Sequence, residues 1–207
     1  SLLLKNSNAE FVLLAINVMD QREILLAIAG LLNKHKIPYL LTGSFASSFY
    51  GYPRATHDID FIVEVNLRSL KKLATALPSL GSSYVFSKKE FVNVDAPTMV
   101  NVYHRKTGTK IDFWVSETNK FKQEFGRRRK TMFDGQPLNL VSAEDLILPK
   151  LLWCMEIRSE RHLNDCAGIW RVQKGKLDEH YLHRRARELS VLDLLLEISS
   201  IDIEKEQ

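Results

Sequence analysis

Two short motifs constrain the fold of this chain more than any other feature: the pair Gly43-Ser44 and the triplet Asp58-Ile59-Asp60. The pair follows an apolar run, residues 37–42, that predicts a β-strand. It precedes a compact segment, residues 45–50, that is long enough for about two helical turns. The triplet lies within a second strand-like run. The motifs therefore predict a strand, a tight turn, a short helix and a second strand, in that order.

The two acids of the triplet are expected on one face of the second strand, residues 57–63. Side chains at i and i+2 of a strand point the same way, so Asp58 and Asp60 would project from the same face. Their Cα atoms would lie about 6.7 Å apart. Two negative charges about 6 Å apart repel by about 3 kcal/mol at an effective dielectric near 20. Bound Mg²⁺ (or Mn²⁺) turns that repulsion into attraction. A turn cap and a solvated acid are the alternative, which the preceding Gly-Ser pair makes weaker.

The same stretch offers residues for binding phosphate. Gly43 and Ser44 are small enough for backbone N–H groups to approach a phosphate, and the following helix would point its N-terminus at it. Arg54, just before the acidic strand, is placed either to reach a triphosphate or to lie on the surface. His57 directly precedes Asp58, so its side chain is expected on the opposite face and not as a metal ligand.

A third acid is predicted from a β-hairpin. Residues 98–104 and 110–115 read as two strands joined by a tight turn. Asp112 lies in the middle of the second, otherwise apolar strand, where an unpaired charge is expensive. A functional role is therefore favoured over a purely structural one.

The runs Leu41-Thr42-Gly43-Ser44 and Ala55-Thr56-His57-Asp58-Ile59-Asp60-Phe61-Ile62-Val63 resemble the signature of the nucleotidyltransferase superfamily, which has the polymerase-β-like fold. Within it, the chain resembles most the small prokaryotic abortive-infection-toxin-like nucleotidyltransferases. The resemblance implies metal-dependent transfer of a nucleoside monophosphate from an NTP to an acceptor. It implies that Asp58 and Asp60 hold a metal pair, and that Asp112 completes the second site and helps to deprotonate the acceptor. An antitoxin protein is the further partner that a toxin-like member implies.

The pattern changes near Val141, from mixed helix and strand to helix throughout. Ser142 is expected as the N-cap of the first C-terminal helix. We predict an α+β fold with a nucleotidyltransferase-type mixed β-sheet and flanking helices, followed by a C-terminal helical region. Residues 1–140 would form the catalytic domain, and residues 141–207 the helical region packed on it.

The phrase at residues 141–151 is similar to one in related proteins, where a helix bearing a basic residue and an aspartate follows. Lys150 is interpreted either as a nucleotide contact or as a lysine at the core boundary that extends to solvent. Pro149 removes a backbone donor within the same helix. Asp165 is expected to have a structural role, pairing Arg161 four positions earlier.

The charge of the chain favours anionic partners without selecting one. The net charge is +4, the sequence pI is about 9.0, and four cations are consecutive at residues 127–130. Such a run binds phosphate or a polynucleotide acceptor such as tRNA, or it forms a solvated strand edge. Both interpretations stay open.

Other features bound the protein class. No run approaches the roughly 20 apolar residues of a membrane span, and the apolar run at residues 11–19 is too short, so no membrane partner is expected. Cys154 and Cys166 form no disulfide or zinc pattern, so a reducing cytoplasm is predicted.

Aromatic residues give weaker signals. The three tryptophans, Trp114, Trp153 and Trp170, are expected in the core. Tyr50 and Tyr52 are candidates to flank a nucleobase, although their spacing selects no role. The alternative to an enzyme is a non-catalytic nucleotide- or RNA-binding module of the same fold, acting as one half of a toxin–antitoxin pair.

Overall fold

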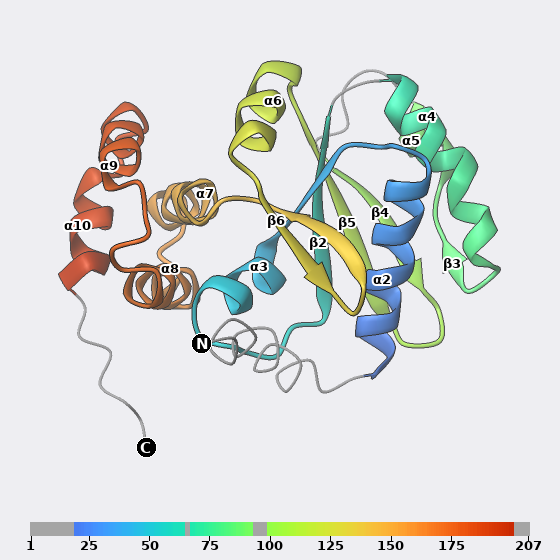
Figure 1. The fold of residues 1–207 in the computed structure, drawn as a ribbon, viewed down its shortest axis with the longest axis horizontal. Helices are drawn as coiled ribbons and strands as arrows, with labels where there is room; N and C mark the ends of the chain where they lie inside the picture. The colour runs from blue at the N-terminus through green and yellow to red at the C-terminus, as the bar shows by residue number, and fades with distance from the viewer. Residues whose placement is uncertain (1–18, 65–66, 93–98, 201–207) are drawn as a thin grey trace. The chain divides into compact units, whose positions relative to one another are not determined.

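The computed structural model of the chain describes residues 19–64, 67–92 and 99–200 (Figure 1). Residues 11–18 of the apolar N-terminal run lie outside these ranges, as does residue 98 at the start of a predicted strand. Within the described residues, no helix has the length and apolar character that a membrane crossing requires.

The chain divides into two compact units. The first runs to Phe45 and resumes from Arg54 to Val141, and the second contains Ala46–Pro53 and the chain from Ser142 onward. The boundary near Val141 lies one residue beyond the predicted one, and a short segment from the middle of the mixed pattern groups with the C-terminal helices. The catalytic role assigned to the first region remains a prediction.

The described part of the first unit contains a seven-stranded mixed sheet with the order β3-β4-β5-β2-β1-β7-β6. β2 runs parallel to β5 and β1 parallel to β7, whereas the other neighbours are antiparallel. The strands are β1 (Tyr39–Thr42), β2 (Asp58–Glu64), β3 (Tyr84–Val85), β4 (Met99–His104), β5 (Thr109–Ser116), β6 (Arg129–Phe133) and β7 (Gln136–Leu140).

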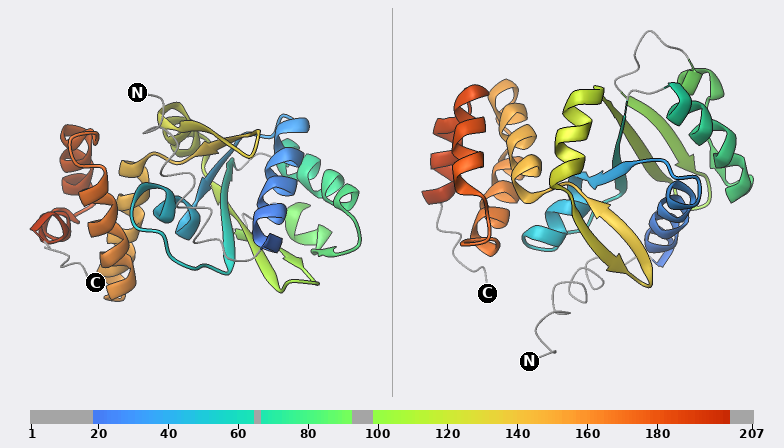
Figure 2. Two further views of the ribbon diagram at one scale, coloured as in Figure 1. Left: turned by 60° about the horizontal axis from the view of Figure 1, so that its bottom comes forward. Right: turned by 45° about the horizontal axis from the view of Figure 1, so that its top comes forward.

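Several helices accompany this sheet: α2 (Met19–Lys34), α4 (Leu67–Ala76), the 3-10 turn η1 (Leu77–Leu80), α5 (Lys88–Val92) and α6 (Thr118–Arg127). Figures 1 and 2 show α2, α4 and α5 on one side of the sheet. The predicted α+β class with a mixed sheet and flanking helices is confirmed. The short helix α3 (Gly43–Tyr50) starts directly after β1, two residues earlier than the sequence pattern indicated.

Strand alternation sorts the sheet into an apolar face and a polar face. Along β2 the exposed or partly exposed residues alternate with buried ones, and Phe61 is fully buried. Phe61 stacks on Phe113 with ring centroids 5.5 Å apart, and Phe91 of α5 meets Phe113 at 6.4 Å. Phe61 points to this ring-packed face, and successive side chains of a strand alternate, so Asp58 and Asp60 lie on the opposite face.

The second unit is helical in its described part. Its helices are α7 (Ala143–Glu156), α8 (Glu160–Val172), α9 (Glu179–Glu188) and α10 (Leu192–Ser200). The predicted N-cap is confirmed, because the Ser142 hydroxyl accepts a hydrogen bond from the Asp145 backbone N–H at 3.1 Å. Pro149 lies inside α7.

The segment Ala46–Pro53 is held to these helices by polar and close backbone contacts. Gln173 donates a side-chain hydrogen bond to the Tyr50 carbonyl at 2.7 Å. A Cβ at Gly51 would lie only 3.0 Å from the Ile169 backbone nitrogen, so the chains approach closely there. Tyr50 is buried, whereas Tyr52 is 51% exposed, so only Tyr52 retains an accessible ring.

The prediction that all three tryptophans belong to the core is wrong for two of them. Trp153 is 50% exposed, because it lies on the outward side of α7. Trp114 is 37% exposed, because strand alternation puts it on the polar face of the sheet, two residues after Asp112. Trp170 is partly buried.

Candidate active site

The register of β2 against β5 brings the three predicted acids onto one face of the sheet. Asp60 pairs directly with Asp112, and Asp58 pairs with Lys110. Neighbouring strands lie about 4.8 Å apart, so these backbone positions are adjacent. On the far side of β5, Asn101 of β4 pairs with Asp112. The polar face therefore carries a compact group of acids with one lysine and one amide among them.

Asp112 is buried, and both of its carboxylate oxygens accept hydrogen bonds. Lys110 Nζ donates to Oδ2 at 2.9 Å, and the Asn101 side-chain amide donates to Oδ1 through a short contact. These donors explain how a carboxylate that is 5% exposed is tolerated in an apolar strand. The hydrogen bond to Asp112 raises the pKa of Lys110, partial burial opposes this, and the Asp58 charge adds to the rise.

Asp60 is fixed from two sides. The Trp114 indole N–H donates to its Oδ1 at 3.1 Å. Its carboxylate lies so close to Gly43 that a Cβ there would be 2.5 Å from Asp60 Cγ and closer still to Oδ2. Gly43 also has a φ of +66°, a conformation that glycine adopts without strain. The Gly43 position therefore requires glycine for two independent reasons.

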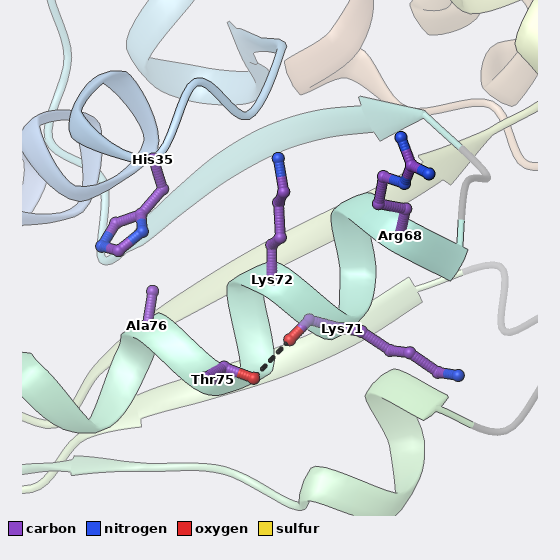
Figure 3. A pocket seen from close by; sticks show the side chains of 6 residues that line it. All are labelled: His35, Arg68, Lys71, Lys72, Thr75 and Ala76. Carbon is purple, nitrogen blue, oxygen red and sulfur yellow. Dashed lines mark hydrogen bonds between the residues drawn. The ribbon is translucent and has the colours of Figure 1, made fainter.

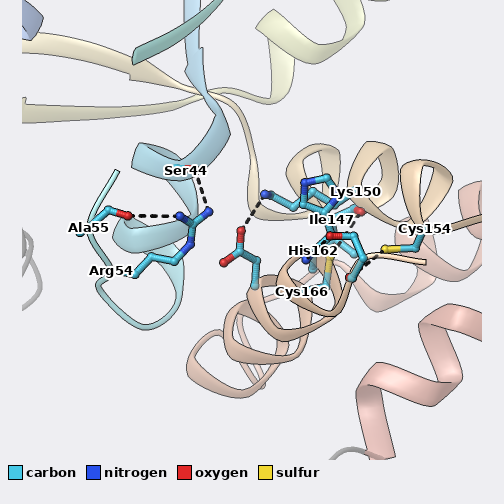
Figure 4. Close-up of polar contacts among 10 residues, drawn as sticks. Ser44, Arg54, Ala55, Ile147, Lys150, Cys154, His162 and Cys166 are labelled. Atoms are coloured by element: carbon cyan, nitrogen blue, oxygen red, sulfur yellow. Dashed lines mark hydrogen bonds and ion pairs between the residues drawn. The ribbon is translucent and has the colours of Figure 1, made fainter. Parts of the chain in front are cut away.

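Ser44 and Arg54, both predicted to bind phosphate, meet in the structure. Arg54 Nη2 donates to the Ser44 hydroxyl at 2.7 Å, and Nη1 contacts the Ala55 carbonyl at 3.4 Å (Figure 4). Ser44 lies at the start of α3, immediately after β1, whose Thr42 pairs with Asp60. An arginine and a helix start thus lie at the strand end that adjoins Asp60.

The residues present fit a divalent cation in part. Asp58 and Asp60 supply carboxylate oxygens, the donors that Mg²⁺ and Mn²⁺ take. For Asp112 to join them, a metal ion would have to compete with the Lys110 ammonium and the Asn101 amide for its oxygens. In the part of the chain that the structure describes, no group of three or more His, Cys, Asp or Glu side chains is arranged to hold a metal ion. The predicted metal set therefore remains a prediction.

Lys110, Asn101 and Trp114 are residues that sequence reasoning missed. Lys110 and Trp114 stand two positions before and after Asp112. The alternation that placed Asp58 and Asp60 together would have placed these two with Asp112. Asn101 lies on the other strand of the predicted hairpin, and its position beside Asp112 depends on the register of that hairpin.

Lys150 belongs to the second unit, where it forms an ion pair. Its Nζ lies 2.8 Å from Asp165 Oδ2, and the two side chains are only 10% and 7% exposed (Figure 4). Lys150 is thus an ion-pair partner of Asp165 that the sequence did not predict, and the pairing of Asp165 with Arg161 stays a prediction. A nucleotide-binding role for Lys150 remains a prediction.

Both cysteines are buried and free in the second unit. Cys166 Sγ lies 3.8 Å from the Ile147 carbonyl oxygen, and burial raises the pKa of its thiol. Cys154 Sγ lies 3.6 Å from the Ser159 carbonyl oxygen. Because both thiols are buried, neither cysteine is a candidate catalytic group.

The basic run at residues 127–130 divides between two environments. The Arg128 guanidinium lies 3.9 Å from the Phe125 ring centroid, and its Nε donates to Asn139 Oδ1 at 3.1 Å. Arg129 and Lys130 are exposed on β6, which is an edge strand of the sheet. The charged-edge interpretation accounts for these two, since edge charges oppose strand pairing between molecules.

A separate basic cavity lies in the first unit, with a volume of about 560 Å³. Figure 3 shows Arg68 and Lys72 projecting from one side of α4, as their i, i+4 spacing dictates. The lining residues are His35, Arg68, Lys71, Lys72, Thr75 and Ala76. None of the predicted site residues is among them, so this cavity is distinct from the acidic group.

No family model matches the sequence, and comparison with curated proteins gives no match. Comparison with solved structures gives several similar chains. ANT(2″)-Ia in complex with adenylyl-2″-tobramycin has a TM-score of 0.61 and 13% identity, over 82% of this chain and 98% of that one. The solution structure of ANT(2″)-Ia gives 0.59 and 13%, over 84% and 95%.

A third similar structure is a nucleotidyltransferase-like protein from Paracoccidioides brasiliensis. Its TM-score is 0.52 and its identity 16%, over 86% of this chain and 94% of that chain. Identities this low establish the fold and not the activity. The chain therefore has the fold of the nucleotidyltransferases, with a mixed sheet and flanking helices.

Proposed function

We propose that this protein is a metal-dependent nucleotidyltransferase that moves a nucleoside monophosphate from an NTP to an acceptor. One observation carries the proposal: the β2–β5 register that sets Asp58, Asp60 and Asp112 on one sheet face, beside the glycine turn at Gly43. The nucleotidyltransferase fold supports it. We further propose membership of the nucleotidyltransferase superfamily, within the toxin-like group that the sequence motif resembles.

The donor triphosphate would bind at the β1–α3 turn. Gly43 brings the backbone close to Asp60, and Ser44 and Arg54 already share a hydrogen bond there. A guanidinium can donate two parallel hydrogen bonds to phosphate oxygens. Arg54 would therefore hold the departing phosphates, and Ser44 would orient it. Lys150 is a further proposed nucleotide contact, provided that it leaves Asp165.

In the reaction, an acceptor oxygen forms a bond to the α-phosphorus while the bond to the bridging oxygen breaks and pyrophosphate leaves. Mg²⁺ or Mn²⁺ held by Asp58 and Asp60 would stabilise the charge on the attacking and leaving oxygens. Asp112 would accept the acceptor proton once Lys110 has moved from its Oδ2. The protein's contribution is mainly positioning and charge stabilisation.

An observation also supports a second candidate, a nucleotide- or RNA-binding module without turnover. Both oxygens of Asp112 accept hydrogen bonds, from Lys110 and from Asn101, so these donors compete with a metal ion for the carboxylate. The basic cavity on α4 would suit a polyanion. Such a module would work with a partner, for which an antitoxin protein is proposed, in the cytoplasm.

Calorimetric titration of the full-length protein with each of the four NTPs, with and without Mg²⁺, tests the proposal. We expect one NTP to bind in a metal-dependent manner, and the binding to be lost in Asp58→Ala/Asp60→Ala. Glu90→Gln is the matched control, because Glu90 is an exposed acid on α5 of the same unit. Loss of binding in the double variant alone supports the proposal.

The outcomes separate the two candidates. Metal-dependent NTP binding followed by label transfer to an RNA or protein fraction supports the transferase. Binding without transfer, and with no change in Asp112→Asn, supports the module. If no NTP binds in either condition, the transferase and a nucleotide-binding module both fail, and titration with RNA then tests the RNA-binding module.

A further inference from the structure

An apolar row lies directly beside the acidic row on the same sheet face. In the register, Asp60 pairs with Asp112, and two residues further along the strands Ile62 pairs with Trp114. Met99 of β4 pairs with Trp114 from the other side. Two residues of a strand span about 6.7 Å. The three side chains Ile62, Trp114 and Met99 therefore form a shelf one step from the carboxylates.

Trp114 is the centre of this apolar shelf. Its indole N–H is used in the 3.1 Å hydrogen bond to Asp60 Oδ1, so its polar atom is satisfied and the ring is anchored. The side chain is nevertheless 37% exposed. What it offers to a ligand is therefore carbon surface of a fixed aromatic ring.

The shelf lies away from the proposed triphosphate position. β1 is antiparallel to β2 and Thr42 pairs with Asp60, so the turn that follows at Gly43 lies toward the Asp58 end, on the β1 side. Trp114 lies toward the Ile62 end, on the β5 side. In an in-line displacement, the nucleophile enters opposite the leaving group. The shelf is therefore on the side where the acceptor would enter.

We propose that Ile62, Trp114 and Met99 form an acceptor subsite that stacks a nucleobase, as part of a nucleoside or of an RNA end. The proposal rests on the proposed transferase function. Every nucleobase has a π-face, and stacking on an anchored aromatic side chain tolerates any base sequence. The positive net charge of the chain favours an acceptor that carries phosphates.

Quenching of tryptophan fluorescence in the full chain measures ligand binding at this subsite. The protein is saturated with Mg²⁺ and a non-hydrolysable ATP analogue and then titrated with adenosine, a single-stranded adenine hexanucleotide, or tobramycin, which has no aromatic ring. We expect adenosine and the hexanucleotide to quench the wild type and tobramycin to leave it unchanged. The quenching should disappear in Trp114→Phe and persist in Trp153→Phe, which removes a similarly exposed ring from α7.

Affinity gives the second measure. Trp114→Leu should weaken binding of the hexanucleotide by about 5- to 100-fold, as expected for the loss of one stacked base. Trp114→Phe should weaken it less, since a ring remains. Circular dichroism of both variants checks that they are folded. A hexanucleotide that binds more tightly than adenosine identifies an RNA end as the acceptor, and equal affinities identify a nucleoside.

Three results would overturn the subsite. The first is quenching that persists in Trp114→Phe, and the second is tobramycin competing with adenosine for the site. The third is full quenching by the ATP analogue alone, which would place the donor base on Trp114. Failure of the transferase proposal looks different: the wild type then binds no NTP by calorimetry, whatever the fluorescence shows.

Discussion

The carboxylate of Asp60 occupies the space that a side chain on Gly43 would need. A Cβ on Gly43 would lie 2.5 Å from Asp60 Cγ, although the two residues belong to different elements and are separated in sequence by the rest of α3. The glycine turn and the acidic strand are thus one structural unit. Neither motif can change without affecting the other.

Gly43→Ala should displace the Asp60 carboxylate and weaken Mn²⁺ binding, measured by calorimetry. Because φ is +66° at Gly43, the substitution should also lower the free energy of unfolding by about 1–2 kcal/mol. Gly108→Ala is the matched control, since Gly108 has φ +72° and no atom lies within 4 Å of the point where its Cβ would stand. Both variants should lose stability, and only Gly43→Ala should lose Mn²⁺ affinity.

Lys110→Met should strengthen Mn²⁺ binding and, without metal, destabilise the fold. The ammonium competes for Asp112 Oδ2, and its removal leaves a buried carboxylate short of one donor, which costs about 1–3 kcal/mol. Urea unfolding with and without Mn²⁺ measures both effects. Lys120→Met removes a 65% exposed side chain from a 3.9 Å pair with the largely buried Glu124, and it should change stability by at most about 1 kcal/mol. Unchanged Mn²⁺ affinity in Lys110→Met would contradict the competition.

The contribution of Lys110 to stability should decline with pH in the alkaline range. Its hydrogen bond to Asp112 raises the pKa of Lys110 above the usual 10.5. A group with a raised pKa in the folded state stabilises fully below its unfolded pKa and loses this contribution as pH rises through the folded pKa. The difference in unfolding free energy between wild type and Lys110→Met should stay constant up to about pH 9 and shrink above 10.5. If this free-energy difference shrinks between neutral pH and about pH 9, the Lys110–Asp112 pair is not its source.

Arg54→Ala should weaken NTP binding about 10- to 100-fold, because a charge-assisted hydrogen bond is worth about 1.5–3 kcal/mol. Arg54→Lys should recover only part of the affinity, since a lysine lacks the planar fork that donates to Ser44 Oγ at 2.7 Å. Calorimetry with the preferred NTP measures both. Equal affinity in all three proteins would remove Arg54 from the site.

Lys150→Met should cost up to about 3–5 kcal/mol of stability, because it removes the ammonium that lies 2.8 Å from the buried Asp165 carboxylate. Lys150→Met/Asp165→Leu should recover most of this loss, since an apolar pair replaces the ion pair. The recovered double variant then tests the nucleotide role independently of folding. If it binds NTP as the wild type does, Lys150 is a structural residue only.

Local sequence rules were sufficient for much of the site. The i, i+2 spacing placed Asp58 and Asp60 on one face, and the apolar run followed by glycine predicted the β1–α3 turn. Ser142 was predictable as an N-cap because a hydroxyl that accepts a hydrogen bond from the backbone N–H three residues later needs no tertiary partner. These features depend on bonds within a few residues, which the sequence alone determines.

Only the tertiary structure decided that β2 and β5, which are far apart in the sequence, are neighbours. Their parallel pairing put Asp112 beside Asp60, and the register of the predicted β4–β5 hairpin put Asn101 beside Asp112. The Trp114–Asp60 hydrogen bond and the Lys150–Asp165 ion pair likewise join residues on different elements. Such contacts are fixed by the packing of whole elements. Elements pack so that their apolar faces are buried, and this packing decides which polar side chains become neighbours.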